Sequence, residues 1–349
     1  MVNSTFNEHD ANINNTDLIT IVGDFVNNCS YDENQHKFIK NLEFYVFRVI
    51  VPSYLGLGAI ANFLVIIFFL QMYKKKISKM RPYHFLIVNL AIVDLLVCVL
   101  VPVVISRTYR TLEKFECLFL ANFARRVCPS ASFWLLVLLA YARYRLIVKP
   151  FRRKLEKKAC CIVVFIVWIF SFAASSYWFS THRYSESEGC LFKKPTKKTL
   201  IFRAVFFVFH STIPLILMWY FPHKIEEKLS EYELDTNIVL RNRKALKTLR
   251  FLLVIFAVTV IPGHIVFLVT YTIIWMEGFM IGFWIWIPYV YPVYLLSVVL
   301  FFSNNVVNVF VYIKMFPGFR RFLLKIFTFG RCGKNEQQRT KTIEARLIK

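Results

Sequence analysis

The fold is decided by stretches such as residues 89–105, which read NLAIVDLLVCVLVPVVI. After Asp94 this stretch continues without another charged side chain as far as Arg107. An apolar run of about 18 residues or more is long enough to cross a hydrocarbon core about 30 Å thick. Seven such segments follow one another, near residues 45–73, 83–107, 115–147, 158–181, 199–222, 247–276 and 283–314. The sequence therefore predicts an all-α integral membrane protein, folded as a bundle of seven transmembrane helices.

The composition excludes other classes of protein. Apolar residues make up 57% of the 349 residues, charged residues only 19%, and the mean hydropathy is +0.50. A soluble domain carries more charge, and a disordered chain carries far less apolar surface. The net charge is +23, but the basic residues cluster beside the apolar segments. The preference for positive charge on the cytoplasmic side explains them, so we expect membrane lipid and not nucleic acid as a partner.

The loops predict the orientation. Residues 74–81, 149–158 and 224–250 are rich in lysine and arginine, whereas the N-terminal region is acidic. By the positive-inside rule the N-terminus is extracellular and the C-terminus cytoplasmic. We expect a multi-pass protein of the plasma membrane.

The ends of the chain differ from the bundle. Residues 1–41 are predicted to form an extracellular tail, glycosylated at the acceptor motifs of Asn3, Asn14 and Asn28. Residues 42–330 form the bundle, which ends in an amphipathic helix over 317–328 lying on the membrane face. The polar segment 331–349 is the cytoplasmic tail.

Polar side chains inside the spans are costly, by roughly 2.5–3.5 kcal/mol for a charge, so each indicates a function or a partner. Asp94 is either a buried cation or proton site or a neutral carboxyl bonded to nearby amides, and we favour the first. Asn304, Asn308 and Tyr312 lie on one face of the seventh span, where amides bridge helices or hold water and ions.

The third span carries a polar stripe made of Arg125, Ser132 and Arg143. At about 100° per residue these three side chains share one face, which we expect to face the bundle. Arg125 lies about 12 Å below Cys117 along the helix, a depth that suits a cavity open to the outside. It binds either a ligand anion or an acidic side chain such as Glu113 or Glu116. Arg126 is predicted to face a neighbouring helix.

These residues, in this order, resemble those of the rhodopsin-like G-protein-coupled receptors over residues 45–330. Residues 89–96 are similar to the second-span motif, and Arg143-Tyr144 resembles the Asp-Arg-Tyr box. Further matches are Asn62 in the first span, Trp168 in the fourth, Pro214 in the fifth, Phe256 with Pro262 in the sixth, and Asn308 with Tyr312 in the seventh, followed by Phe319-Arg320 as the start of helix eight.

The resemblance implies a mechanism. An agonist would bind in the outer half, the sixth span would swing outward near Phe256 and Pro262, and a heterotrimeric G protein would insert at the inner face. Arg143, with Tyr144 beside it, would be the coupling arginine. Tyr312 would turn inward to support the active state.

The resemblance also implies several sites. Asp94, Ser132, Asn304 and Asn308 would form a sodium pocket that favours the inactive state, the only cofactor expected. Cys117 and Cys190 would form the disulfide between the third span and the second outer loop, and Cys332 would be palmitoylated. Cys117 lies one residue too far from Arg143 for the family spacing, and a small bulge would absorb the difference.

Four residues depart from the family pattern. Ala142 replaces the acidic neighbour of Arg143, so the usual ionic lock is missing. Val260 replaces the switch tryptophan, Val309 replaces the seventh-span proline, and Pro222 stands where the fifth span usually has a tyrosine. These changes allow high basal activity, weaker coupling or a separate switch.

The ligand is predicted to be anionic. Phe302 occupies the position of the retinal lysine of opsins, and Arg125 stands about where amine receptors place an aspartate. The outer cavity would carry a positive field from a set of candidate ligand-binding residues: Arg107, Arg125, Arg126, Arg203, His210 and His264. The two histidines are alternatively satisfied core residues. An acidic peptide, a carboxylate metabolite or a lipid acid would fit, and Pro102 favours a peptide.

Other classes of function are less well supported. A transporter or channel needs polar groups along a continuous path, whereas these fall into an outer and an inner set. An enzyme is not expected, because the histidines show no metal-ligand spacing and no nucleophile lies beside a base. A membrane protein without signalling activity is the remaining alternative.

Overall fold

The computed structural model describes residues 33–74, 82–106, 113–149, 157–186, 189–192, 196–231, 237–275 and 280–327. In this part of the chain, seven helices are long and apolar enough to cross a membrane. Their spans are Lys37–Lys74, Tyr83–Ile105, Glu116–Val148, Lys158–Phe179, Lys197–Ser230, Asn242–Val266 and Tyr291–Lys314. The predicted bundle of seven transmembrane helices is therefore confirmed.

The first three spans are helical, and the first and third of them include π-helical turns (η). They comprise α2 (Glu33–Phe44), η1 (Tyr45–Ile50) and α3 (Val51–Lys74), then α4 (Pro82–Ser106), then η3 (Glu116–Leu120), η4 (Phe123–Val127) and α5 (Cys128–Val148).

The remaining four spans are also helical, and a pair of strands lies between the fourth and the fifth. They comprise α6 (Lys157–Phe179), the strands β1 (His182–Ser185) and β2 (Gly189–Phe192), then α7 (Lys197–Phe207), η5 (Val208–Thr212) and α8 (Ile213–Ser230), then α9 (Asn237–Trp275), α10 (Met280–Met315) and α11 (Pro317–Phe327).

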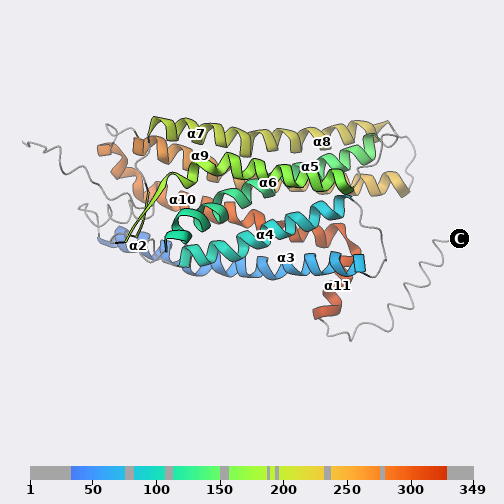
Figure 1. Cartoon of the computed structure of the whole chain (residues 1–349), viewed down its shortest axis with the longest axis horizontal. Helices are drawn as coiled ribbons and strands as arrows, with labels where there is room; N and C mark the ends of the chain where they lie inside the picture. Colours follow the sequence, from blue (N-terminus) through green and yellow to red (C-terminus); the bar gives the residue numbers. More distant parts are fainter. Residues whose placement is uncertain are drawn as a thin grey trace, which may run out of the picture.

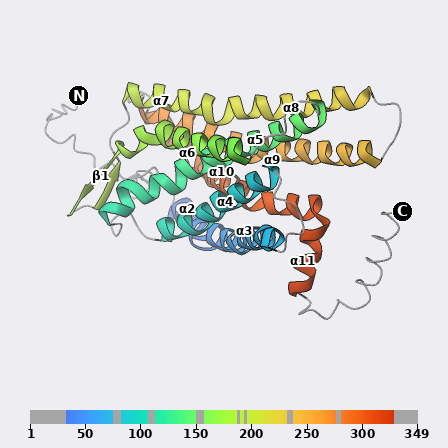
Figure 2. The same ribbon diagram turned by 45° about the vertical axis from the view of Figure 1, so that its right-hand side comes forward.

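The long helices run along one axis of the molecule, with α3 and the α7–α8 pair on opposite sides (Figure 1). The strands β1 and β2 pair antiparallel, with Tyr184 opposite Cys190. This hairpin caps one end of the bundle, and α11 runs across the axis at the other end (Figure 2). The two ends of the bundle are therefore structurally different.

Three helices extend further than the apolar segments predicted. The first begins at Glu33 instead of residue 45, α8 continues to Ser230, and α9 begins at Asn237. These extensions are polar, so hydropathy does not mark them, and they are helical because they continue a helix that is already nucleated. The hairpin was also not predicted from the sequence.

The outer surface of the bundle is apolar, and inside it polar and small residues join helices at particular points within a hydrophobic core. Large side chains such as Phe165 (65% exposed) and Val254 (58%) point outward, where lipid covers them in a membrane. Inside, the Asn62 amide donates to the backbone oxygens of Gly58 and Asn305, both at 3.0 Å, and so ties α3 to α10. A Cβ on Gly58 would lie 2.6 Å from Val306, so only glycine allows this approach.

The helix α11 confirms the expected amphipathic segment after the seventh span. Phe319 is buried, and its ring lies 5.3 Å from that of Phe68 on α3, while Phe322 lies 5.5 Å from the same ring. Arg320 and Arg321 are exposed. The apolar face thus holds α11 against the bundle and leaves the basic face outside.

Candidate functional site: an outer cavity and the third span

The outer part of the third span is wound partly as a π-helix. Two π-helical turns, η3 and η4, precede the regular helix α5. A π-turn takes up one residue more than an α-turn because its hydrogen bonds join residues five apart. The bulge expected from the spacing of Cys117 and Arg143 is therefore present.

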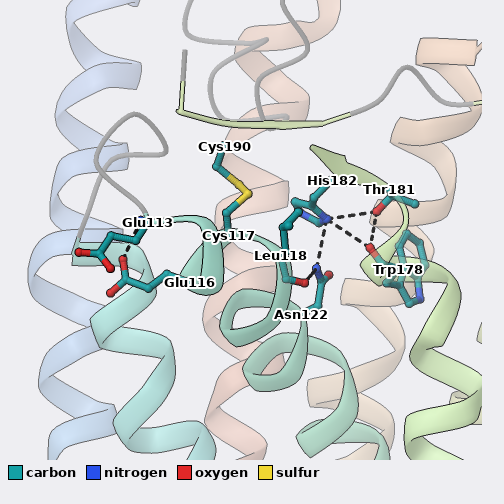
Figure 3. Close-up of a disulfide and its surroundings, with 9 residues drawn as sticks. All are labelled: Glu113, Glu116, Cys117, Leu118, Asn122, Trp178, Thr181, His182 and Cys190. Carbon is teal, nitrogen blue, oxygen red and sulfur yellow. Dashed lines mark hydrogen bonds between the residues drawn. A yellow bond between two sulfur atoms is a disulfide. The ribbon is translucent and has the colours of Figure 1, made fainter. Parts of the chain in front are cut away.

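A disulfide fixes this end of the span to the hairpin. The sulfur atoms of Cys117 on η3 and Cys190 on β2 are 2.04 Å apart, and both residues are fully buried (Figure 3). The pairing implied by the resemblance is confirmed.

The hairpin also contributes a buried histidine. In Figure 3 the Nδ1 atom of His182 lies 3.2 Å from the Asn122 amide nitrogen and 3.3 Å from the backbone oxygen of Trp178. Burial, and next the positive charge of Arg125, lower the pKa of His182 to about 3. His182 is therefore neutral at physiological pH, and it joins the third span to the end of α6.

Two arginines pack on one tryptophan ring beside this histidine. The guanidinium carbon of Arg126 lies 4.5 Å from the ring centroid of Trp178, and that of Arg203 lies 4.2 Å from it. Trp178 is buried at 2% exposure and Arg203 at 7%. The expectation that Arg126 faces a neighbouring helix is confirmed, since Trp178 belongs to α6.

A small cavity, partly open to solvent, lies beside Arg125 and Arg126. Its lining residues are Arg125, Arg126, Pro129, Ser130, Phe133, Phe206, His210, His264 and Phe301. The Ser130 hydroxyl lies 2.8 Å from His210 Nδ1 and donates to the Ser171 hydroxyl at 3.0 Å. The cavity thus has two arginines, neutral polar groups and aromatic walls, and none of its lining residues is acidic.

Aromatic contacts connect the cavity to the sixth span. The ring of His264 lies 5.6 Å from that of Phe301, which lies 6.1 Å from Phe133. Phe133 meets Phe256 edge to face at 5.0 Å, and Phe256 is fully buried. A ligand that displaced Phe133 or Phe301 would therefore press on α9 near Pro262.

A second polar site lies deeper, around Asp94. One carboxyl oxygen accepts a hydrogen bond from Ser132 at 2.8 Å, and the other accepts one from the Asn308 amide at 2.8 Å. The bonds join α4, α5 and α10. Asn304, one helical turn before Asn308 on α10, is buried, and its amide atoms have no hydrogen-bond partner among the residues that the structure describes. The structure therefore brings three of the four predicted residues into direct contact: Asp94, Ser132 and Asn308.

The inner end of the third span carries Arg143. Its guanidinium carbon lies 4.4 Å above the ring of Tyr83 on α4. Tyr144 beside it packs on Phe221 of α8, with ring centroids 5.4 Å apart. Tyr312 is buried in the same half, at 1% exposure.

The candidate ligand residues are only partly brought together. Arg125, Arg126, His210 and His264 line the cavity, whereas Arg203 packs on Trp178 and is not among the lining residues. The other predicted site residues lie outside the described residues: Arg107, Asn3, Asn14, Asn28 and Cys332.

Several site residues were not predicted. No motif or spacing marked these residues in the sequence: Trp178, His182, Ser130 and Tyr83. Aromatic residues make up 17% of the chain, so Trp178 and Tyr83 do not stand out. No group of three His, Cys, Asp or Glu side chains able to hold a metal ion occurs within the described ranges.

The chain has the architecture of a seven-transmembrane receptor. It has seven membrane-spanning helices, a cavity at the disulfide-bonded end and an arginine at the opposite end. The sequence matches the family described as 7 transmembrane receptor (rhodopsin family) over residues 61–312, and the chain belongs to that family. It is therefore a signalling receptor of the G-protein-coupled type, from a family of receptors and not of enzymes. A search of curated proteins finds no match.

Proposed function

We propose that this receptor binds an anionic extracellular ligand in the outer cavity and activates a heterotrimeric G protein through Arg143. The observation that carries the ligand class is the pair Arg125 and Arg126, which both line the same cavity. A guanidinium binds a carboxylate through two parallel hydrogen bonds. A cationic amine would meet repulsion at the same place.

The walls of the cavity narrow the ligand further. A small carboxylate, or the acidic end of a longer peptide or lipid acid, would enter between them. The aromatic walls formed by Phe133, Phe206 and Phe301 suit an apolar group next to the negative charge.

The disulfide supports the predicted orientation. Disulfides persist in oxidising surroundings, which supports placing the Cys117–Cys190 end outside the cell. The start of α2 lies at that end, and α11 lies at the other (Figure 1). We infer a plasma-membrane receptor with its N-terminus extracellular, and an N-terminal epitope tag should bind antibody on unpermeabilised cells.

The ligand class is tested with a panel of straight-chain carboxylates and amines of equal carbon number. The receptor is purified in detergent, and thermal unfolding is followed by tryptophan fluorescence. We expect a carboxylate to raise the melting temperature of the wild type but not of Arg125→Gln or Arg126→Gln. The exposed Arg250→Gln is the matched control and should keep the response. Stabilisation by the amines alone, or by carboxylates in Arg125→Gln as well, would contradict an anionic ligand.

The coupling is tested without any ligand. Activation of a panel of Gα proteins is compared in cells for the wild type, Arg143→Ala and Ala142→Asp at equal surface expression. Basal activation should disappear in Arg143→Ala and fall in Ala142→Asp, because the new carboxylate can hold the arginine. Activation that Arg143→Ala leaves unchanged would exclude the proposed role of this residue.

The Asp94 site is proposed to bind sodium. Asp94 and Ser132 supply oxygen atoms, and the amide oxygens of Asn304 and Asn308 are buried without hydrogen-bond partners among the described residues. Such oxygens suit a hard cation. When bound, the ion would supply positive charge that balances the buried carboxylate and would favour the arrangement that brings α4, α5 and α10 together.

A further inference from the structure

The coupling arginine lacks the neighbour that restrains it in the family pattern. Ala142 precedes Arg143, so no carboxylate can pair with the guanidinium from the adjacent position. The acidic side chains of α8 are engaged elsewhere. Glu226 bonds to Arg250 of α9, Glu227 lies 2.6 Å from Lys224, and Glu231 bonds to Lys228.

The side chain of Arg143 lies instead on an aromatic face. Its guanidinium carbon is 4.4 Å from the ring centroid of Tyr83, within the distance at which a cation is attracted to a π-system. Both residues are half-buried, so water screens the attraction only partly.

The ring of Tyr83 is itself held in place by other aromatic side chains. It lies 4.1 Å from the ring of His84 and is nearly parallel to Phe316, at 6.4 Å. His84 in turn contacts Phe69 of α3 at 5.2 Å, and Phe316 lies between α10 and α11. The platform is therefore built from the first, second and seventh spans, and none of its rings belongs to α9.

We infer that Tyr83 is the positioning residue that holds Arg143 in the resting receptor, in place of the missing acidic neighbour. The inference rests on the proposed coupling through Arg143. To meet a G protein, the guanidinium must leave the ring, so the contact stabilises the closed state.

The experiment measures the opening of α9 and needs no G protein. A fluorophore that senses its surroundings is attached to the exposed position Lys247→Cys, in a receptor whose Cys29, Cys161 and Cys332 are replaced by serine. The open fraction is compared in lipid nanodiscs for the wild type, Tyr83→Leu, Tyr83→Phe and Arg143→Gln. Tyr73→Leu, which changes an exposed tyrosine at the inner end of α3, is the matched control.

We expect Tyr83→Leu to raise the ratio of open to closed receptor about two- to fivefold, the loss of one cation–π contact. Tyr83→Phe, which keeps the ring, and Tyr73→Leu should match the wild type. Arg143→Gln should open the receptor at least as much as Tyr83→Leu does, and the double variant should open no further than Arg143→Gln. Arg143→Gln keeps the test valid if Tyr83→Leu folds poorly.

Two results would overturn the inference. One is an unchanged open fraction in Tyr83→Leu and Arg143→Gln. The other is an equal rise in Tyr83→Phe, which would assign the effect to the hydroxyl group. If α9 opens as expected and no Gα protein responds to any variant, the proposed coupling fails while the role of Tyr83 stands.

Discussion

The two ends of the third span are held by opposite kinds of contact. At the outer end, a covalent bond joins Cys117 to the hairpin, and His182 adds hydrogen bonds to Asn122. At the inner end, Arg143 rests on the face of Tyr83 without a covalent tie. The outer end is therefore fixed by a covalent bond, whereas the inner end is held by a non-covalent contact that can be released.

The largest effect is expected from cutting the covalent tie at the outer end. Cys190→Ser should lower the free energy of unfolding by about 2–5 kcal/mol, because the unfolded chain regains the freedom that the disulfide removes. Thermal unfolding of the purified receptor, followed by tryptophan fluorescence, measures the loss. Cys161→Ser, which changes an exposed free thiol, is the control. A melting temperature equal to that of the control would mean that the outer end does not depend on the disulfide.

A smaller effect is expected from the pH dependence of the same end. The pKa of His182 is about 3 in the folded receptor, so between pH 3 and 6.5 the unfolded chain binds a proton that the folded receptor does not. Stability should therefore be full above pH 6.5 and should fall below it, by about 2 kcal/mol at pH 5. His182→Asn should flatten this part of the stability curve.

The control for this measurement is the exposed His223→Asn, which should keep the slope of the wild type. If His182→Asn retains the full loss of stability between pH 6.5 and 5, another group causes it. The hydrogen bonds of His182 would then contribute to the outer end without setting its pH dependence.

The smallest effect concerns the Asp94 site, which lies between the two ends. At a sodium concentration ten times the dissociation constant, binding should stabilise the receptor by about 1.4 kcal/mol. The melting temperature should rise when choline chloride is replaced by sodium chloride, and Asp94→Asn should abolish the rise. Ser303→Ala removes a hydroxyl that bonds only to its own helix and should keep it. An unchanged response in Asp94→Asn would place the sodium effect elsewhere.

The parts of the molecule that the sequence predicts well are those where burial is most costly. A carboxyl group in an apolar span must find donors, so burial alone singles out Asp94. The family resemblance groups it with Ser132 and Asn308, and both lie within hydrogen-bond distance of it. The apolar segments located the spans for the same reason. Hydropathy says nothing about polar helical extensions, and so the starts of α2 and α9 were placed too late.

The aromatic contacts could not be predicted in the same way. Trp178 and Tyr83 are ordinary residues in a chain so rich in aromatic side chains, and each could pack on many neighbours. Their partners Arg126 and Arg143 were identified because they are charged, but the sequence does not state which ring each one meets. That pairing depends on how the helices are rotated, and the π-helical turns alter this rotation in the third span.

The π-turn η4 also has a consequence for how such a receptor diversifies. One extra residue in an α-helix would rotate everything beyond it by about 100°. Here η4 places the extra residue beside Arg125 and Arg126, and the regular helix resumes at Cys128. Ser132 and Arg143 keep the register that their sites require. The third span thus consists of two parts that can change separately. An insertion in the outer part can change the residues that line the outer cavity without rotating Ser132 and Arg143.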